Sequence, residues 1–189
     1  MNQKLIILIA LFAIQLAVPG FMIFEQNQIL SKGKVFNFKT RPIDPYDPFR
    51  GRYVVLSYAA NQNPIAVVPG TNIEANQWVY ALLGLDKDGY AVIEGLTDKK
   101  PDDDEDFLYI ETSWGTQEGG FRVKLPFNRY YASEVNAPKI ESAVWRRQRE
   151  QVDDVFAKIR VLDGKATIED LYVNKMPIKD FIEKQQDKL

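Results

Sequence analysis

Two carboxylates and three guanidinium groups are concentrated in one proline-rich stretch of the chain, residues 41–58. Asp44 and Asp47 are three residues apart, and three prolines of this stretch share that spacing. Polyproline II has three residues per turn, so the two aspartates lie along one edge of a stiff, extended loop. Such a pair can act as general acid and base, but a solvated loop moves neither pKa towards neutrality. These residue types therefore favour a binding or structural role over catalysis.

A strand follows the loop directly and has to position it. Gly51 supplies a turn, after which residues 52–58 alternate between two faces, as a β-strand does. We expect at least one arginine of the loop within ion-pair reach of one of its aspartates, because charges this close are poorly screened from one another. Two interpretations stay open, a binding site and a structural seal at the start of the strand. The candidate residues for both are Arg41, Asp44, Asp47, Arg50, Gly51, Arg52, Tyr53 and Tyr58.

The composition excludes several classes of site. The chain has 189 residues and contains neither cysteine nor histidine. Thiol nucleophiles, serine–histidine–aspartate triads and the ordinary zinc sites each need one of those side chains. We therefore assign no catalytic residue and expect neither a metal nor a cofactor. The net charge of −2 does not indicate the positively charged surface of a nucleic-acid-binding protein, so nucleic acid is not an expected partner.

The N-terminal segment is apolar enough to anchor the chain in a membrane. Residues 5–24 are interrupted only by a glutamine, a proline and a glycine, and twenty helical residues span a hydrocarbon core of about 30 Å. A cleaved signal has a shorter apolar core and a small-residue site, which residues 17–19 match poorly. We expect residues 1–25 to form an uncleaved, single-pass signal anchor and residues 26–34 a polar spacer. The short tail is most simply left in the cytoplasm, which places the soluble part on the periplasmic side, although the lysines after the span argue weakly for the opposite orientation.

The rest of the chain predicts a mainly β (α+β) fold in two similar β-rich halves, residues 35–100 and 101–189. An acidic run at residues 98–106 lacks the glycine and the ligand spacing of a calcium loop, so we expect a solvated linker there. The expected elements are strands at residues 35–40 and 107–112, a hairpin at 78–96, an amphipathic helix at 137–149 and a charged helix at 178–189.

The two halves resemble each other in sequence. Residues 79–96 align with residues 155–171 when Lys87 is skipped, and eight of the seventeen pairs are identical. The segment 126–131 also echoes residues 48–53. We interpret the pattern as an internal duplication, with equivalent hairpins about a pseudo-two-fold axis. Two hairpins of one generic pattern can also match by chance, so both explanations stay open.

Residues 51–58 resemble the Gly-Asp-Tyr-x-x-Leu-x-Tyr signature of the GDYXXLXY family of bacterial proteins. The likeness extends to residues 129–131 and to residues 163–173, and so covers most of the soluble part. Arg52 stands where the family has its aspartate. If that aspartate serves chemistry in the family, the chemistry is lost here. If it only forms an ion pair with an arginine, Arg52 can pair instead with Asp44 or Asp47. The resemblance implies a membrane-associated protein and names no reaction.

These observations favour a membrane-anchored, non-enzymatic β-domain that binds a protein, a peptide or an envelope component. Its expected partners are the membrane, through residues 5–24, and an integral membrane or envelope protein. The alternative is an extracytoplasmic hydrolase, because the loop and strand faintly resemble the nucleophile region of signal-peptidase-like folds. Those folds use a serine–lysine pair, and residues 41–51 contain no serine, while Ser57 lies within the strand. A hydrolase of this type would therefore be inactive here.

Overall fold

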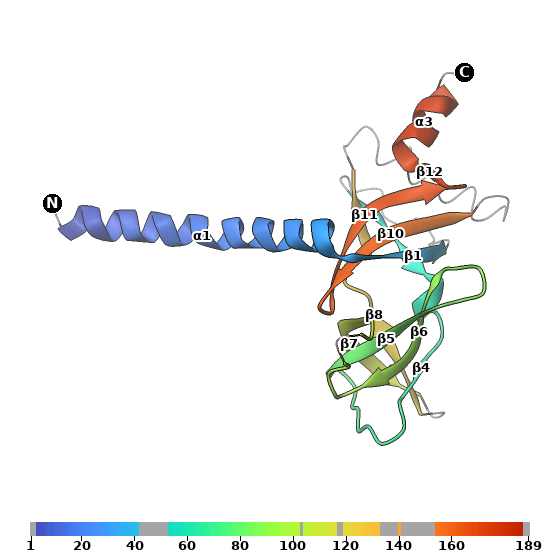
Figure 1. The fold of residues 1–189 in the computed structure, drawn as a ribbon. Coiled ribbons are helices and arrows are strands. Elements are labelled where there is room, and N and C mark those ends of the chain that lie inside the picture. The colour runs from blue at the N-terminus through green and yellow to red at the C-terminus, as the bar shows by residue number, and fades with distance from the viewer. Residues whose placement is uncertain are drawn as a thin grey trace.

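The computed structural model describes residues 3–41, 53–102, 104–116, 119–132, 140 and 154–186. A long N-terminal helix projects from a β-rich domain that ends in a short helix (Figure 1). The expected mainly β fold with an N-terminal apolar helix is thereby confirmed. The amphipathic helix predicted at residues 137–149 lies outside the described residues except for Ile140, which is helical and buried.

Most predicted elements are present at the expected places. The strand at 35–40 is β1, the hairpin at 78–96 is β5 with β6, and the strand at 107–112 is part of β7. In chain order the elements are α1 (Gln3–Lys32), β1 (Lys34–Arg41), β2 (Tyr53–Val55), β3 (Ser57–Tyr58), a 3-10 turn (Ala59–Asn61), β4 (Ile65–Ala66), β5 (Trp78–Leu85), β6 (Ala91–Thr97), β7 (Phe107–Gly115), β8 (Gly120–Lys124), β9 (Arg129–Tyr131), β10 (Val155–Leu162), β11 (Lys165–Val173), β12 (Met176–Pro177) and α3 (Ile178–Gln186).

The strands form two five-stranded sheets and a ribbon in which β2 pairs with β9. One sheet has the order β12-β11-β10-β1-β3, and the other has the order β4-β8-β7-β5-β6. The second sheet closes on itself, because Val67 forms a parallel bridge with Leu96 and the Val68 amide donates to the Leu96 carbonyl at 2.9 Å. We call this closed sheet the barrel. Closure pairs the two outer strands and protects them from unwanted association.

The two halves of the sequence exchange strands. β1 pairs with β10, and β7 pairs with β5, so the first strand of each half joins the hairpin of the other half. The boundary expected near residue 100 therefore does not separate the sheets. In the ribbon, Tyr53 lies opposite Tyr131, which is its counterpart in the echoed segments. A two-fold axis relating the halves would place equivalent residues opposite each other in this way.

The two hairpins are built alike. Each contains one β-bulge, at Glu94 in the β5–β6 hairpin and at the aligned Glu169 in the β10–β11 hairpin. The aligned turn glycines, Gly89 and Gly164, have φ angles of +84° and +76°, which L-residues rarely adopt. The sheets thus look like repeated halves, and a common origin by duplication stays a prediction.

α1 does not end where its apolar run ends. The helix continues to Lys32, so residues 26–32 of the expected spacer are helical, and only Gly33 separates them from β1. Contacts with the β10–β11 hairpin explain the difference, since Ile29 is buried and the Gln26 amide donates to the Thr167 hydroxyl. The described apolar side chains before residue 25 are exposed, and α1 is long and apolar enough to cross a membrane.

A charged cluster fixes the end of α1 to the second hairpin. Lys158 Nζ lies 2.7 Å from Glu169 Oε1, and Arg160 Nε donates to the other carboxylate oxygen. Arg160 Nη1 also donates to the carbonyl of Gly33 at 3.0 Å, directly after the helix. Burial acts to raise the pKa of Glu169, but the hydrogen bonds from both cations outweigh it and lower that pKa.

We expect Glu169→Gln to lower the free energy of unfolding by about 1–2 kcal/mol at pH 7, because two charge-assisted hydrogen bonds weaken. Since the folded-state pKa is lowered, the contribution of the carboxylate is present above the unfolded-state pKa of about 4.3. It is lost as the pH falls below that value and through the lower folded-state pKa. The measurement is urea denaturation of the full chain in non-ionic detergent between neutral and acid pH. The control is Glu94→Gln at the aligned bulge, where Gly84 stands in the position of Arg160. Equal losses of unfolding free energy in both variants would show that the contacts of Glu169 with Lys158 and Arg160 do not stabilise the fold.

Candidate functional site

The structure describes three of the residues predicted for the site. Arg41 lies at the end of β1, opposite Ser57, and Tyr53 and Tyr58 lie in β2 and β3. The ion pairs predicted for the loop stay predictions, because the other five candidate residues lie outside the described residues: Asp44, Asp47, Arg50, Gly51 and Arg52.

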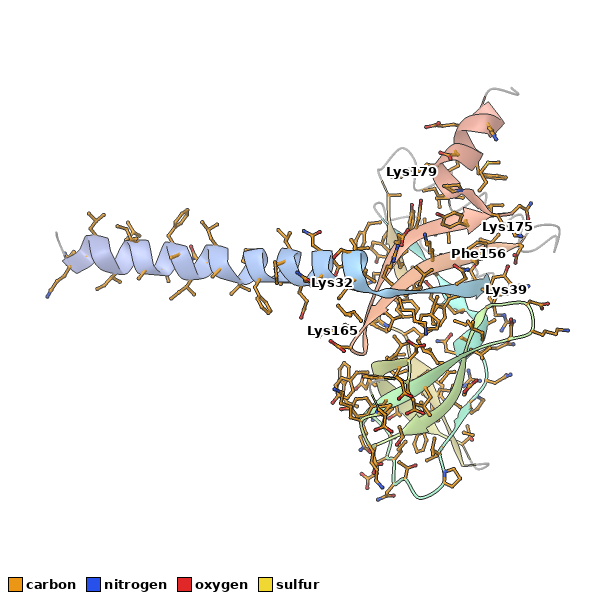
Figure 2. The ribbon with its side chains drawn as sticks, in the orientation of Figure 1. Lys32, Lys39, Phe156, Lys165, Lys175 and Lys179 are labelled. Carbon is orange, nitrogen blue, oxygen red and sulfur yellow. The ribbon has the colours of Figure 1, made fainter. Side chains whose placement is uncertain are left out.

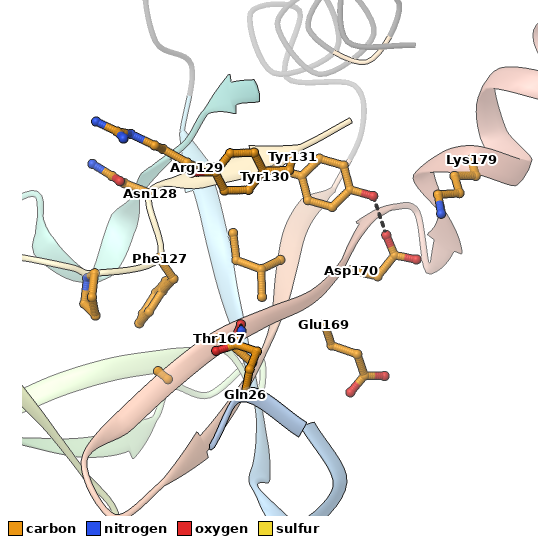
Figure 3. Close-up of a pocket in the computed structure, with 13 residues that line it drawn as sticks. Gln26, Phe127, Asn128, Arg129, Tyr130, Tyr131, Thr167, Glu169, Asp170 and Lys179 are labelled. Atoms are coloured by element: carbon orange, nitrogen blue, oxygen red, sulfur yellow. Dashed lines mark hydrogen bonds between the residues drawn. The ribbon is translucent and has the colours of Figure 1, made fainter. Parts of the chain in front are cut away.

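A pocket of about 710 Å³ lies between β9, β11, α1 and the start of α3 (Figure 3). β9 and the segment before it form one wall, β11 forms another, and Gln26 of α1 closes the floor against Thr167. The lining residues are Gln26, Pro126, Phe127, Asn128, Arg129, Tyr130, Tyr131, Ala166, Thr167, Ile168, Glu169, Asp170 and Lys179.

Tyr130 and Asp170 join the two walls of the pocket. The Tyr130 hydroxyl donates to Asp170 Oδ1 at 2.8 Å, and the same oxygen accepts the Leu171 amide at 2.8 Å. Burial raises the pKa of the Tyr130 phenol well above its usual value, and the hydrogen bond and negative charge of Asp170 raise it further. The phenol therefore stays protonated at neutral pH and acts as a hydrogen-bond donor, not as a nucleophile.

The rim of the pocket carries charges of both signs. Arg129 and Lys179 are exposed cations, and Lys179 extends towards Asp170 (Figure 3). Asp170 supplies acceptor oxygens on the wall formed by β11, where Lys158 and Arg160 already hold the carboxylate of Glu169. Within the described ranges no three carboxylates gather in a way that could hold a metal ion. The arrangement suits a ligand that both donates and accepts hydrogen bonds.

Residues 15–171 match the sequence model of the family described as GDYXXLXY protein. The chain belongs to the GDYXXLXY family. The matched region extends from the apolar helix through the signature strand to β11, and so includes most of the pocket. Searches of curated proteins and of solved structures gave no match.

In this GDYXXLXY protein the end of the signature builds the core. Leu56 and Tyr58 are buried together with Val54, as the predicted alternation required. The Leu56 amide donates to the Asn128 carbonyl, and the Tyr58 hydroxyl donates to the Phe127 carbonyl, both at 2.8 Å. Burial raises the pKa of Tyr58, which stays protonated. These two signature residues are therefore structural, and they hold the segment that becomes the wall of the pocket.

Tyr53 connects the signature of the GDYXXLXY protein to the pocket itself. Its ring lies 5.1 Å from the Arg129 guanidinium and 6.0 Å from the Tyr131 ring, and both of those residues line the pocket. The sequence had singled out residues 129–131 by their echo of residues 48–53. Gln26, Asp170 and Lys179 carried no such signal, because they come from distant elements that only the fold brings together.

Proposed function

We propose that this GDYXXLXY protein is a single-pass, membrane-anchored, non-enzymatic domain whose pocket binds a polar segment of a partner protein. The observation that carries the proposal is the position of Gln26. This residue lines the pocket and lies only two positions after Phe24, the last residue of the apolar run. A pocket held there supports a partner that exposes a segment close to the membrane, as an integral membrane or envelope protein does.

The size and lining of the pocket support a peptide over an apolar small molecule. Ligand pockets usually have volumes of about 300–1,000 Å³, so 710 Å³ is ample, but most are lined by apolar side chains. Here charged and amide groups from α1, β9 and the segment before it, β11 and α3 surround the space. An extended peptide offers both donors and acceptors along its backbone and can use such a lining.

The direct passage from α1 to β1 gives the pocket a fixed height above the membrane. Gly33 alone separates the two elements, Glu25 and Gln26 of the helix contact the hairpin, and Ile29 is buried. We place the domain on the extracytoplasmic side, because long folded domains translocate largely regardless of flanking charges such as the lysines that follow the apolar run. The partner segment is therefore extracytoplasmic too.

A photo-crosslinking residue at position 131, placed in the full chain in native membranes, tests the binding site. Tyr131 is 71% exposed at the rim of the pocket, so its replacement should not disturb the fold. We expect discrete crosslinked products that weaken several-fold when Lys179→Glu reverses the charge of the rim. The matched control is Lys175→Glu, which makes the same change in an exposed residue outside the pocket (Figure 2). Products that persist in the Lys179 variant, or that fall equally in both variants, would reject this pocket as the binding site.

A further inference from the structure

We propose that an exposed aromatic patch on the barrel, formed by Trp78, Tyr80 and Tyr109, is a second membrane contact. In this arrangement the patch lies in the headgroup region of the bilayer that α1 crosses. The inference rests on the membrane anchoring proposed above. It adds a surface of the folded domain to the contacts that the helix makes.

The patch consists of large rings on the outside of β5 and β7. Trp78 is 56% exposed and Tyr109 is 44% exposed, and their rings stack at a centroid distance of 5.2 Å. Tyr80 lies beside them, with its ring centroid 5.0 Å from that of Tyr109. Tryptophan and tyrosine are enriched where a membrane protein meets the membrane–water interface, because their rings are partly apolar and partly polar.

A short series of contacts connects the patch to the end of the apolar helix. Glu25, the first residue after the apolar run, forms an ion pair with Lys165 at the tip of the β10–β11 hairpin. The neighbouring residue, Gly164, accepts a hydrogen bond from the Tyr109 amide at 2.8 Å. The hairpin tip thus lies between α1 and β7, and Lys165 is on the side of the domain from which α1 emerges (Figures 1 and 2). The headgroup region adds about 5–7 Å to each side of the hydrocarbon core, so a surface next to Glu25 lies at that depth.

The charges around the hairpin tip decide what kind of bilayer surface the patch fits. A neighbouring cavity of about 310 Å³ is lined by three lysines and three carboxylates, which balance one another: Lys32, Lys34, Lys100, Glu105, Asp106 and Asp163. Recognition of anionic lipids usually needs a cluster of about 4–8 basic residues without such balance. The occupant is therefore the interfacial region of an ordinary zwitterionic bilayer, which the rings enter without a requirement for anionic lipid.

Tryptophan fluorescence of the full chain in phosphatidylcholine vesicles tests this contact. Trp114→Phe with Trp145→Phe leaves Trp78 as the only reporter. We expect its emission to be quenched when the vesicles contain lipid brominated close to the glycerol backbone, and to be shielded from aqueous iodide. The control chain keeps only Trp114, which is 65% exposed on β7 and lies five residues farther along the strand from the hairpin tip that Tyr109 contacts. Trp114 should remain open to iodide and unaffected by brominated lipid.

Flotation of the same vesicles separates failure of the patch from failure of the anchor. A chain that floats with the vesicles, but whose Trp78 is open to iodide and unquenched by brominated lipid, would overturn the patch and leave the anchor intact. A chain that does not float would overturn the anchor and, with it, the patch. Quenching that requires anionic lipid would also contradict the proposal, since the charges at the hairpin tip are balanced.

Discussion

Phe38→Ala is expected to lower the free energy of unfolding by about 3–5 kcal/mol, the cost of deleting a fully buried aromatic ring. Phe38 has no exposed surface, and its ring meets those of Tyr58 and Phe127 edge-to-face at 5.8 and 5.0 Å. It also lies opposite Ala157 in the β1–β10 pair, one of the two places where the halves exchange strands. Deleting the ring therefore weakens the packing of β1 against the signature strand and the segment before β9, and weakens the β1–β10 pair. Urea denaturation of the full chain in non-ionic detergent measures it.

Two further variants show whether the lost stability comes from the contacts among the rings of Phe38, Tyr58 and Phe127. Tyr58→Phe keeps the ring but leaves the buried Phe127 carbonyl without its donor, and should cost about 1–3 kcal/mol. Tyr131→Ala removes an exposed ring and should change stability by about 0.5 kcal/mol or less. A loss at Phe38 as small as that at Tyr131 would show that the three rings do not hold the halves together.

Gly164→Ala should cost about 2–4 kcal/mol, because two penalties add at one position. The residue has a φ of +76°, which an alanine adopts only with strain. An added methyl group would also lie 2.8 Å from the Phe107 ring and 3.0 Å from Tyr109 Cβ. Those contacts are where the second hairpin meets β7, so the substitution pushes the hairpin away from the barrel.

The aligned glycine of the other hairpin provides the control. Gly89 has a φ of +84° but no atom within 4 Å of the position that a methyl group would take. Gly89→Ala should therefore show the backbone strain alone, about 1–2 kcal/mol. If the two variants lose equal stability, the close packing of Gly164 against β7 contributes nothing measurable.

The parts of the fold that depend on local pattern could be predicted from the sequence. Alternating apolar residues and a turn glycine were enough for β1 and both hairpins, because these features decide strand faces and tight turns within a few residues. The buried side of the signature strand followed from the same alternation. Tyr53 and Tyr131, the last residues of the two segments that echo each other, lie opposite each other in the ribbon, and the echo alone did not predict that pairing.

The parts that depend on distant contacts could not be predicted. Residues 26–32 look like a polar spacer, and their helix is explained by contacts such as Gln26 with Thr167, 141 residues later. The exchange of β1 and β7 between the two halves has no local signature. Apolar and polar residues alternate along each strand in the same way whichever strand it pairs with. The pocket could not be predicted either, because α1, β9, β11 and α3 each contribute only part of its lining.

Alkaline carbonate extraction of membranes containing the full chain tests the central claim, that α1 anchors the domain, most directly. A chain with Phe12→Arg and Ile14→Arg is the control, because each charge at the centre of a membrane helix costs about 2.5–3.5 kcal/mol. We expect the unaltered chain to stay in the pellet with its N-terminus intact and the arginine variant to move to the supernatant. Release of the unaltered chain, or a mature N-terminus that begins after residue 17, would contradict the central claim.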